Sequence, residues 1–137
     1  MTTEANKALV RRYQEILNEN RLDELDQVLA ADLRTPDILP GLPSGIEGAK
    51  AVHRMMLAGV PDFRTTIDDM IAEGGKVAAR ITMSGTHTGD VMGIPASGNK
   101  LNFPGMYFVT IFNGKIVEHR GVEDSTALLQ QLGGLKT

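Results

Sequence analysis

The chain has 137 residues, the length of one ordinary domain, with 14 basic and 17 acidic side chains and a formal net charge of −3. It has no basic run that could follow a phosphate backbone, no stretch of 18 apolar residues, no basic and apolar leader, and no cysteine. We therefore expect a single cytoplasmic domain over residues 1–137 that binds neither nucleic acid nor membrane.

The N-terminal half predicts three helices. Apolar residues recur at helical spacing over residues 5–17, and a shorter repeat over residues 22–29 predicts a second helix. A proline-rich break follows. Ser44 and Glu47 then fit a capping box at the start of a third helix, which we expect to end near residue 58.

The C-terminal half predicts strands. Gly74-Gly75 fits a two-residue turn between alternating apolar and polar segments. Residues 101–112 are apolar on both parities, which predicts a strand covered on both faces. Asn113-Gly114 readily takes positive φ and so fits a tight hairpin into a last strand. Helices first and an antiparallel sheet second predict an α+β domain, with helices packed on one face of a curved sheet.

Two segments of this half are candidates for a functional site. Residues 89–98 form the one long loop predicted among the strands, and such loops are often lids or binding loops. Asp124 lies between the last strand and an apolar helical segment over residues 125–132. An aspartate in this place is a favoured helix N-cap, and it is also well placed to stand over a cavity.

Several short motifs occur in a fixed order along nearly the whole chain. They are Pro61-Asp-Phe63, Ala72-Glu-Gly74, Gly85-Thr-His-Thr-Gly89, Gly93-Ile-Pro95, and Gly114-Lys-Ile-Val-Glu118 through Asp124 to Leu128-Leu-Gln-Gln-Leu-Gly133. This ordered set resembles the SnoaL-like polyketide cyclases of the nuclear transport factor 2-like superfamily. The resemblance implies a cone, in which a strongly bent antiparallel sheet wraps against three helices around an internal pocket, commonly in a homodimer.

The same resemblance implies that Asp124 is the general acid/base of an intramolecular aldol condensation that needs neither metal nor cofactor. Proton transfer by a positioned carboxylate contributes roughly 10²–10⁴-fold to such a reaction. Relatives often have an aromatic residue where this chain has Arg120. An arginine beside Asp124 would favour the charged carboxylate and weaken it as a base. Alternatively, Arg120 pairs with Glu118, or it binds an acidic substrate or an enolate oxygen.

We expect a small-molecule substrate to contact five further residues. Tyr13 lies on the apolar face of the first helix, where it also suits core packing. His53 lies on the apolar stripe of the third helix, either as a core residue or as a proton donor. His87 either ends its strand or stands at the pocket mouth. Met106 and Phe108 suit a roomy apolar cavity, although core packing explains methionine equally well.

His119 has the opposite strand parity to Asp124, so we expect it to face away from the site. The three histidines form no local metal motif, and we expect no metal.

The sequence favours an enzyme, a cofactor-independent cyclase or isomerase acting on a small apolar carbonyl-bearing molecule such as a polyketide. One alternative is an epoxide hydrolase or another lyase on the same fold, in which Arg80 and Asp124 belong to an Asp-Arg-Asp arrangement. Another is a non-catalytic module that binds a small ligand and uses Asp124 only as a cap. The fold does not decide among them, because one fold hosts many functions.

Overall fold

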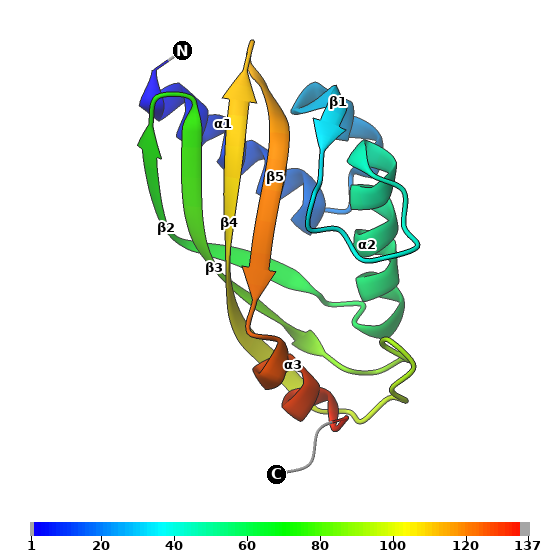
Figure 1. The fold of residues 1–137 in the computed structure, drawn as a ribbon. Coiled ribbons are helices and arrows are strands. Elements are labelled where there is room, and N and C mark those ends of the chain that lie inside the picture. The colour runs from blue at the N-terminus through cyan, green and yellow to red at the C-terminus, as the bar shows by residue number, and fades with distance from the viewer. Residues whose placement is uncertain (1, 135–137) are drawn as a thin grey trace.

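The computed structural model describes residues 2–134. In chain order its elements are α1 (Thr3–Asn18), the 3-10 helix η1 (Leu22–Gln27), β1 (Leu29–Arg34), α2 (Gly45–Gly59), β2 (Arg64–Glu73), β3 (Lys76–Thr86), β4 (Lys100–Phe112), β5 (Lys115–Glu123) and α3 (Ser125–Leu132). The strands form one curved sheet in the order β1-β5-β4-β3-β2. In Figure 1, α1 crosses behind the sheet and α2 lies beside it. α3 lies at the bottom of the view, where β5 ends.

Both predicted turns are confirmed. Gly74 and Gly75 join β2 to β3, and Asn113 and Gly114 join β4 to β5 with φ of 50° and 75°. Each of the neighbouring pairs among β2, β3, β4 and β5 is antiparallel. The tight turns fix these hairpins because their conformation is set by the two residues themselves.

The second predicted helix is confirmed over Leu22–Gln27, as the 3-10 helix η1, but it does not reach Leu29, and the expected antiparallel sheet contains one parallel pair. Helical structure ends at Gln27, and Leu29 begins β1, which pairs with β5 in parallel through the partners Leu29 and Ile116. The amide of Ile116 donates to the carbonyl of Val28 at 2.9 Å. A short apolar run fits a helix or a buried strand equally well. Here the strand forms because the edge of β5 provides hydrogen-bond partners for its backbone.

The third predicted helix is confirmed as α2, with Ser44 at its N-cap. The Ser44 side chain makes no cap hydrogen bond, so the expected capping box does not form. Instead, the amide of Gly45 donates to the hydroxyl of Thr35 at 3.1 Å. The start of α2 is therefore fixed by the loop that leads into it.

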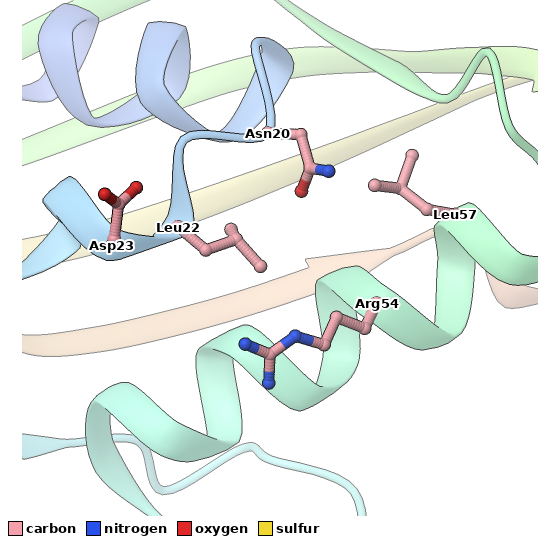
Figure 2. A pocket seen from close by; sticks show the side chains of 5 residues that line it. All are labelled: Asn20, Leu22, Asp23, Arg54 and Leu57. Carbon is pink, nitrogen blue, oxygen red and sulfur yellow. The ribbon is translucent and has the colours of Figure 1, made fainter.

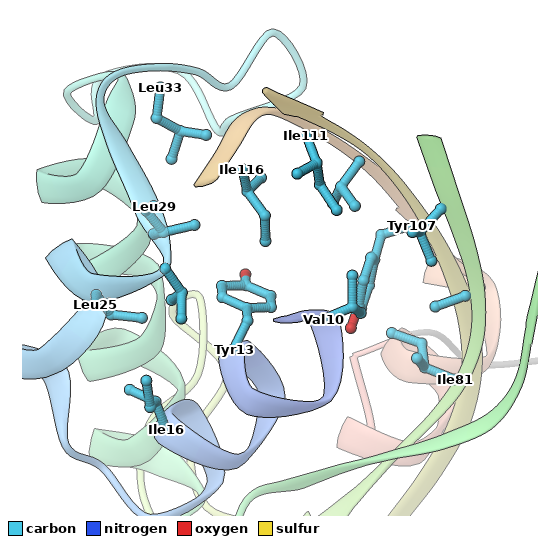
Figure 3. Packing of buried hydrophobic residues seen from close by; sticks show 14 of the residues in the cluster. Val10, Tyr13, Ile16, Leu25, Leu29, Leu33, Ile81, Tyr107, Ile111 and Ile116 are labelled. Carbon is cyan, nitrogen blue, oxygen red and sulfur yellow. The ribbon is translucent and has the colours of Figure 1, made fainter. Parts of the chain in front are cut away.

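The main core lies between the inner face of the sheet, α1, η1 and β1. Val10, Tyr13 and Ile16 of α1 face residues such as Tyr107 and Ile111 of β4 across this core (Figure 3). A second buried cluster lies at the α3 end, where Val60, Val91, Leu101, Phe103, Leu128 and Leu132 pack together. No helix within residues 2–134 has the length and apolar character needed to cross a membrane.

Residues 2–134 leave much of the outer face of the sheet uncovered. β4 alternates, with Leu101, Phe103, Tyr107, Val109 and Ile111 buried and the other parity exposed except for half-buried Thr110. The prediction that both faces of this strand are covered is therefore wrong for the single chain. The exposed apolar residues on the outer face of β2, β4 and β5, called the outer apolar patch below, are Ile71, Met106, Phe108, Phe112 and Val122.

Candidate active site

Three aromatic rings meet on the inner face of the sheet. Tyr13 comes from α1, Tyr107 from β4 and His119 from β5. The ring centroids of Tyr107 and His119 are 4.9 Å apart, and those of Tyr13 and Tyr107 are 6.1 Å apart in an edge-to-face arrangement. The Tyr13 and His119 centroids are 5.8 Å apart. These three residues, called the inner cluster below, bring together parts of the chain that are far apart in sequence.

The inner cluster is uncharged at neutral pH. Burial raises the pKa of Tyr13 and of Tyr107, so both hydroxyl groups keep their protons. The Tyr107 hydroxyl donates to Oε1 of Gln14 at 3.3 Å. Burial lowers the pKa of His119 from 6.5 to about 4, although the Asp37 carboxylate acts in the opposite direction. Neutral rings with N–H and O–H groups suit the oxygen of a carbonyl or an enol better than they suit an ion.

His119 was expected to face away from the site, and this prediction is wrong. Val109 and His119 are register partners in β4 and β5, and Val109 is fully buried on the inner face. Gly121 likewise pairs with buried Tyr107. The parity of β5 that reaches the inner face is therefore that of His119 and Gly121, not that of Asp124. The aromatic surroundings of His119 come from distant segments and leave no local signal.

Asp124 is the N-cap of α3, as the capping alternative predicted. Its Oδ1 accepts from the amide of Ala127 at 3.0 Å, and its own amide donates to the carbonyl of Pro104 at 3.0 Å. The residue is exposed, and its carboxylate is in no ion pair within the described part of the chain. It lies five residues beyond His119, about 16 Å further along the strand direction.

Arg120 lies on the outer face, where its Nε is 3.3 Å from Oε1 of Glu118. Nε of Arg34 is 3.3 Å from the other Glu118 oxygen. The hydrogen bond from Arg120 and then that from Arg34 lower the pKa of Glu118. The alternative that Arg120 pairs with Glu118 is confirmed, and its placement beside Asp124 is wrong.

Met106 and Phe108 also lie on the outer face, where 53% and 46% of their surfaces are exposed. The Nζ of Lys76 stands 5.5 Å from the centroid of the Phe108 ring. A cavity lined jointly by Tyr13, Met106 and Phe108 therefore does not form, because the sheet separates Tyr13 from the other two. Alternate residues of a strand point to opposite faces, and the buried parity of β4 is that of Tyr107.

The two other predicted histidines lie in different surroundings. His53 on α2 is half-buried, and burial lowers its pKa, which a hydrogen bond with the backbone of Leu17 opposes. Its Nε2 is buried and has no hydrogen-bond partner within residues 2–134. His87 is fully buried, with Nδ1 2.8 Å from Oγ of Ser97 and Nε2 3.2 Å from the carbonyl oxygen of Ile94. Its placement at a pocket mouth is wrong, because both ring nitrogens are bonded inside the loop.

The described part of the chain does not bring Arg80 and Asp124 together, as the epoxide hydrolase alternative expected. Arg80 lies on the outer face opposite Met106, and its Nη1 is 3.9 Å from Oδ2 of Asp68. Asp124 is at the end of a different strand. No group of three His, Cys, Asp or Glu side chains in the part of the chain that the structure describes is arranged to hold a metal ion.

A hollow of about 400 Å³ opens between the end of α1, η1 and α2 (Figure 2). It is lined by Asn20, Leu22, Asp23, Arg54 and Leu57, so its wall is partly apolar and carries charges of both signs. A smaller hollow of about 260 Å³ lies between α1 and the start of β2 and includes Gln14. Arg54 follows His53 on α2, but His53 is not among the residues that line the larger hollow.

Comparison with known proteins identifies the family. A model of the SnoaL-like polyketide cyclases matches residues 7–132. Aklanonic acid methyl ester cyclase DnrD of Streptomyces peucetius is 28% identical over 128 residues, which are 91% of this chain and 88% of that protein. Nogalonic acid methyl ester cyclase of Streptomyces nogalater is 26% identical over 118 residues, with coverages of 85% and 88%.

Solved structures agree with this match. TsrD from Streptomyces laurentii superposes with a TM-score of 0.89 at 32% identity, covering 98% of this chain and 99% of that one. A SnoaL-like polyketide cyclase from Agrobacterium tumefaciens gives a TM-score of 0.79 at 25% identity, with coverages of 97% and 100%. The chain belongs to the SnoaL-like polyketide cyclase family and has its nuclear transport factor 2-like fold.

Proposed function

We propose that the protein is a cofactor-independent cyclase that closes a ring in a small, mostly apolar, carbonyl-bearing molecule of the polyketide class. The observation behind this proposal is the family match over residues 7–132, together with relatives of similar length that cyclise polyketide methyl esters. The neutral inner cluster supports the same substrate class, because its O–H and N–H groups suit carbonyl and enol oxygens.

In the proposed reaction, the Asp124 carboxylate removes a proton from a carbon flanked by two carbonyl groups. The resulting enolate carbon attacks the carbon of a further carbonyl group of the same molecule. The new alkoxide then takes the proton from the Asp124 carboxyl group. The product therefore has the same composition as the substrate. Oδ1 of Asp124 is fixed by the Ala127 amide, and this bond orients the carboxylate.

The inner cluster has a second part in this proposal. A polyketide that extends from Asp124 along the inner side of β5 would reach His119 about 16 Å away, a length that suits several fused rings. The cluster then binds the distal oxygens, while Asp124 acts at the reacting carbon. His53, with its unpartnered Nε2, is a further hydrogen-bonding group on α2.

The test is turnover of aklanonic acid methyl ester and nogalonic acid methyl ester, followed by chromatography and mass spectrometry. Ring closure changes the retention time without changing the mass. Asp124→Asn should lower turnover by roughly 10²–10⁴-fold. Asp90→Asn is a matched control, because exposed Asp90 likewise accepts a backbone hydrogen bond from a residue three positions later, Gly93 at 3.0 Å.

Full turnover by Asp124→Asn would show that this carboxylate is not the acid/base of the reaction. Tight binding of both esters without any conversion by the wild-type protein would instead favour the non-catalytic binding module.

We also infer that two copies associate through the outer apolar patch. Its five residues are 46–70% exposed, and they lie next to both basic and acidic groups, among them Arg80 with Asp68 and Arg120 with Glu118. A second copy would bring the same apolar residues and both charge signs to the interface, which is the self-complementarity that a two-fold dimer requires.

A further inference from the structure

The ring of His87 is held in one tautomer by the loop that it begins. Nε2 is 3.2 Å from the carbonyl oxygen of Ile94, which can only accept, so Nε2 carries the hydrogen. Nδ1 is 2.8 Å from Oγ of Ser97 and 3.3 Å from the Ser97 amide nitrogen, which can only donate. Nδ1 is therefore the acceptor of the backbone N–H, and the neutral ring satisfies both sides of the loop.

This loop, residues 87–99, is fastened to two helices. The amides of Thr88 and Gly89 donate to the carbonyl of Gly59 at the end of α2, at 3.0 and 2.9 Å. On the other side, Nδ2 of Asn99 donates to the carbonyl of Gln131 in α3 at 2.9 Å. The loop thus joins the end of α2 to the helix that Asp124 begins.

Apolar contacts strengthen the link to α3. Val91 is 1% exposed and belongs to the second buried cluster with Leu128 and Leu132, against which Ile94 also packs. The carbonyl oxygen of Ile94 is also the group that accepts the hydrogen bond from Nε2 of His87. The same hydrogen bond therefore fixes the stretch of loop that covers α3.

Within residues 2–134, the His87 ring has no acidic hydrogen-bond partner that could compensate a second proton. Residues 57–60 at the end of α2 and residues 125–132 of α3 contain no charged side chain. Of the charged residues nearest in the chain, Asp62 accepts from Thr86, Asp90 accepts from the Gly93 amide, and Lys100 begins β4. Within residues 2–134 none of them bonds to the fully buried His87 ring.

We propose that His87 is a positioning residue whose neutral ring holds loop 87–99 between α2 and α3, and that protonation of the ring releases this loop and loosens α3 with its Asp124 cap. A proton on Nδ1 would make it a donor that faces the Ser97 amide N–H, which is also a donor. It would also leave a buried positive charge without an ion-pair partner. The consequence for turnover rests on the proposed function of Asp124, whereas the consequence for the loop does not.

The first test is nitrogen-15 NMR of the imidazole rings in the wild-type protein at about pH 7.5, a pH at which an ordinary histidine is neutral. We expect the His87 signals of the Nε2–H tautomer, with Nδ1 unprotonated. The opposite tautomer, or a doubly protonated ring at this pH, would overturn the proposal. This measurement needs neither a variant nor a substrate.

The second test is backbone hydrogen exchange at about pH 7.5 and pH 5, corrected for the intrinsic effect of pH on exchange. In the wild-type protein, residues 88–99 and 125–132 should lose protection by about 10- to 100-fold at the lower pH. His87→Gln keeps an acceptor and a donor but gains no proton, so residues 88–99 and 125–132 of this variant should lose no more protection than the rest of its chain. His53→Gln is the matched control and should behave as the wild type does.

Equal losses of protection in the wild type and His87→Gln would refute the positioning role. If cyclase turnover is found, kcat of the wild type should fall at the lower pH together with loop protection, and kcat of His87→Gln should not follow that trend. If no turnover is found, the exchange and NMR results still decide whether His87 holds the loop.

Discussion

At the scale of single residues, Asp124 combines a structural bond with the proposed chemistry. Its Oδ1 accepts from the Ala127 amide, and asparagine makes the same kind of cap. Asp124→Ala should therefore lower the free energy of unfolding by about 1 kcal/mol, whereas Asp124→Asn should change it little. Urea denaturation measures both. If asparagine destabilises as much as alanine, the negative charge rather than the hydrogen bond stabilises the start of α3.

His119 gives a second prediction at this scale. Its pKa is lowered from 6.5 to about 4 in the folded protein by burial. Between these values the unfolded chain binds more protons than the folded one, so the free energy of unfolding falls as the pH falls, by at most about 1.4 kcal/mol per pH unit. His53, whose pKa is also lowered, contributes with the same sign.

Urea denaturation from about pH 7 to pH 4.5, across the range in which an ordinary histidine titrates, tests this prediction. His119→Gln removes the titrating ring and should flatten the dependence relative to the wild type. Parallel curves for the two proteins would contradict the assignment of a depressed pKa to His119.

Sequence reasoning found the cap at Asp124 because capping depends on neighbouring residues. It misplaced His119, Met106 and Phe108 because their faces depend on the side of the sheet on which α1 packs. This side is not encoded in the residues of the strands themselves. Alternation assigns strand residues to two groups, but the packing of other elements decides which group is buried.

At the scale of elements, α2 is held against the loop that precedes it by Gly48. A Cβ atom at this position would lie 1.9 Å from the carbonyl oxygen of Pro43 and 2.3 Å from Cδ1 of Ile38. Gly48→Ala should therefore destabilise the protein by about 1–3 kcal/mol, although alanine is the better helix former by about 1 kcal/mol. Thermal unfolding tests this.

The neighbouring Glu47→Ala is the control for Gly48→Ala, because Glu47 is exposed on the same helix. It should leave the midpoint of unfolding nearly unchanged. Stabilisation by Gly48→Ala would mean that the loop over residues 38–43 moves aside without cost.

Elements fixed by local chemistry were predicted well, and those fixed by distant pairing were not. The turn at Asn113 and Gly114 was predicted because only these two residues must adopt positive φ. The strand β1 was missed because its hydrogen bonds are made to β5, near the other end of the chain. A six-residue apolar pattern contains no information about such a partner.

At the scale of the whole molecule, the proposed dimer predicts a change in mass. Val122→Glu places a charge in the outer apolar patch, where 69% of the wild-type side chain is exposed, so the fold should tolerate it. Light scattering after size exclusion should show a dimer for the wild type and a monomer for Val122→Glu, because an unpaired charge is costly to bury in an interface.

Leu39→Glu is the matched control for Val122→Glu. Leu39 is also an exposed apolar residue, at 44%, but it lies in the loop between β1 and α2. This variant should remain a dimer. A monomeric wild-type protein at tens of micromolar would contradict association through the patch, as would dissociation of Leu39→Glu alone.

The parallel pairing of β1 with β5 also has a consequence for biosynthesis. β1 leaves the ribosome early, whereas β5 is the last strand to be made. Until β5 emerges, β1 has no partner strand, and the nascent chain must keep its apolar residues Leu29 and Leu33 from aggregating. Long-range pairings of this kind slow folding, because the chain loses the entropy of closing a long loop before the new contacts offset this loss. Pairing of β1 with β5 therefore comes late in the synthesis of this sheet, after all of its other strands have been made.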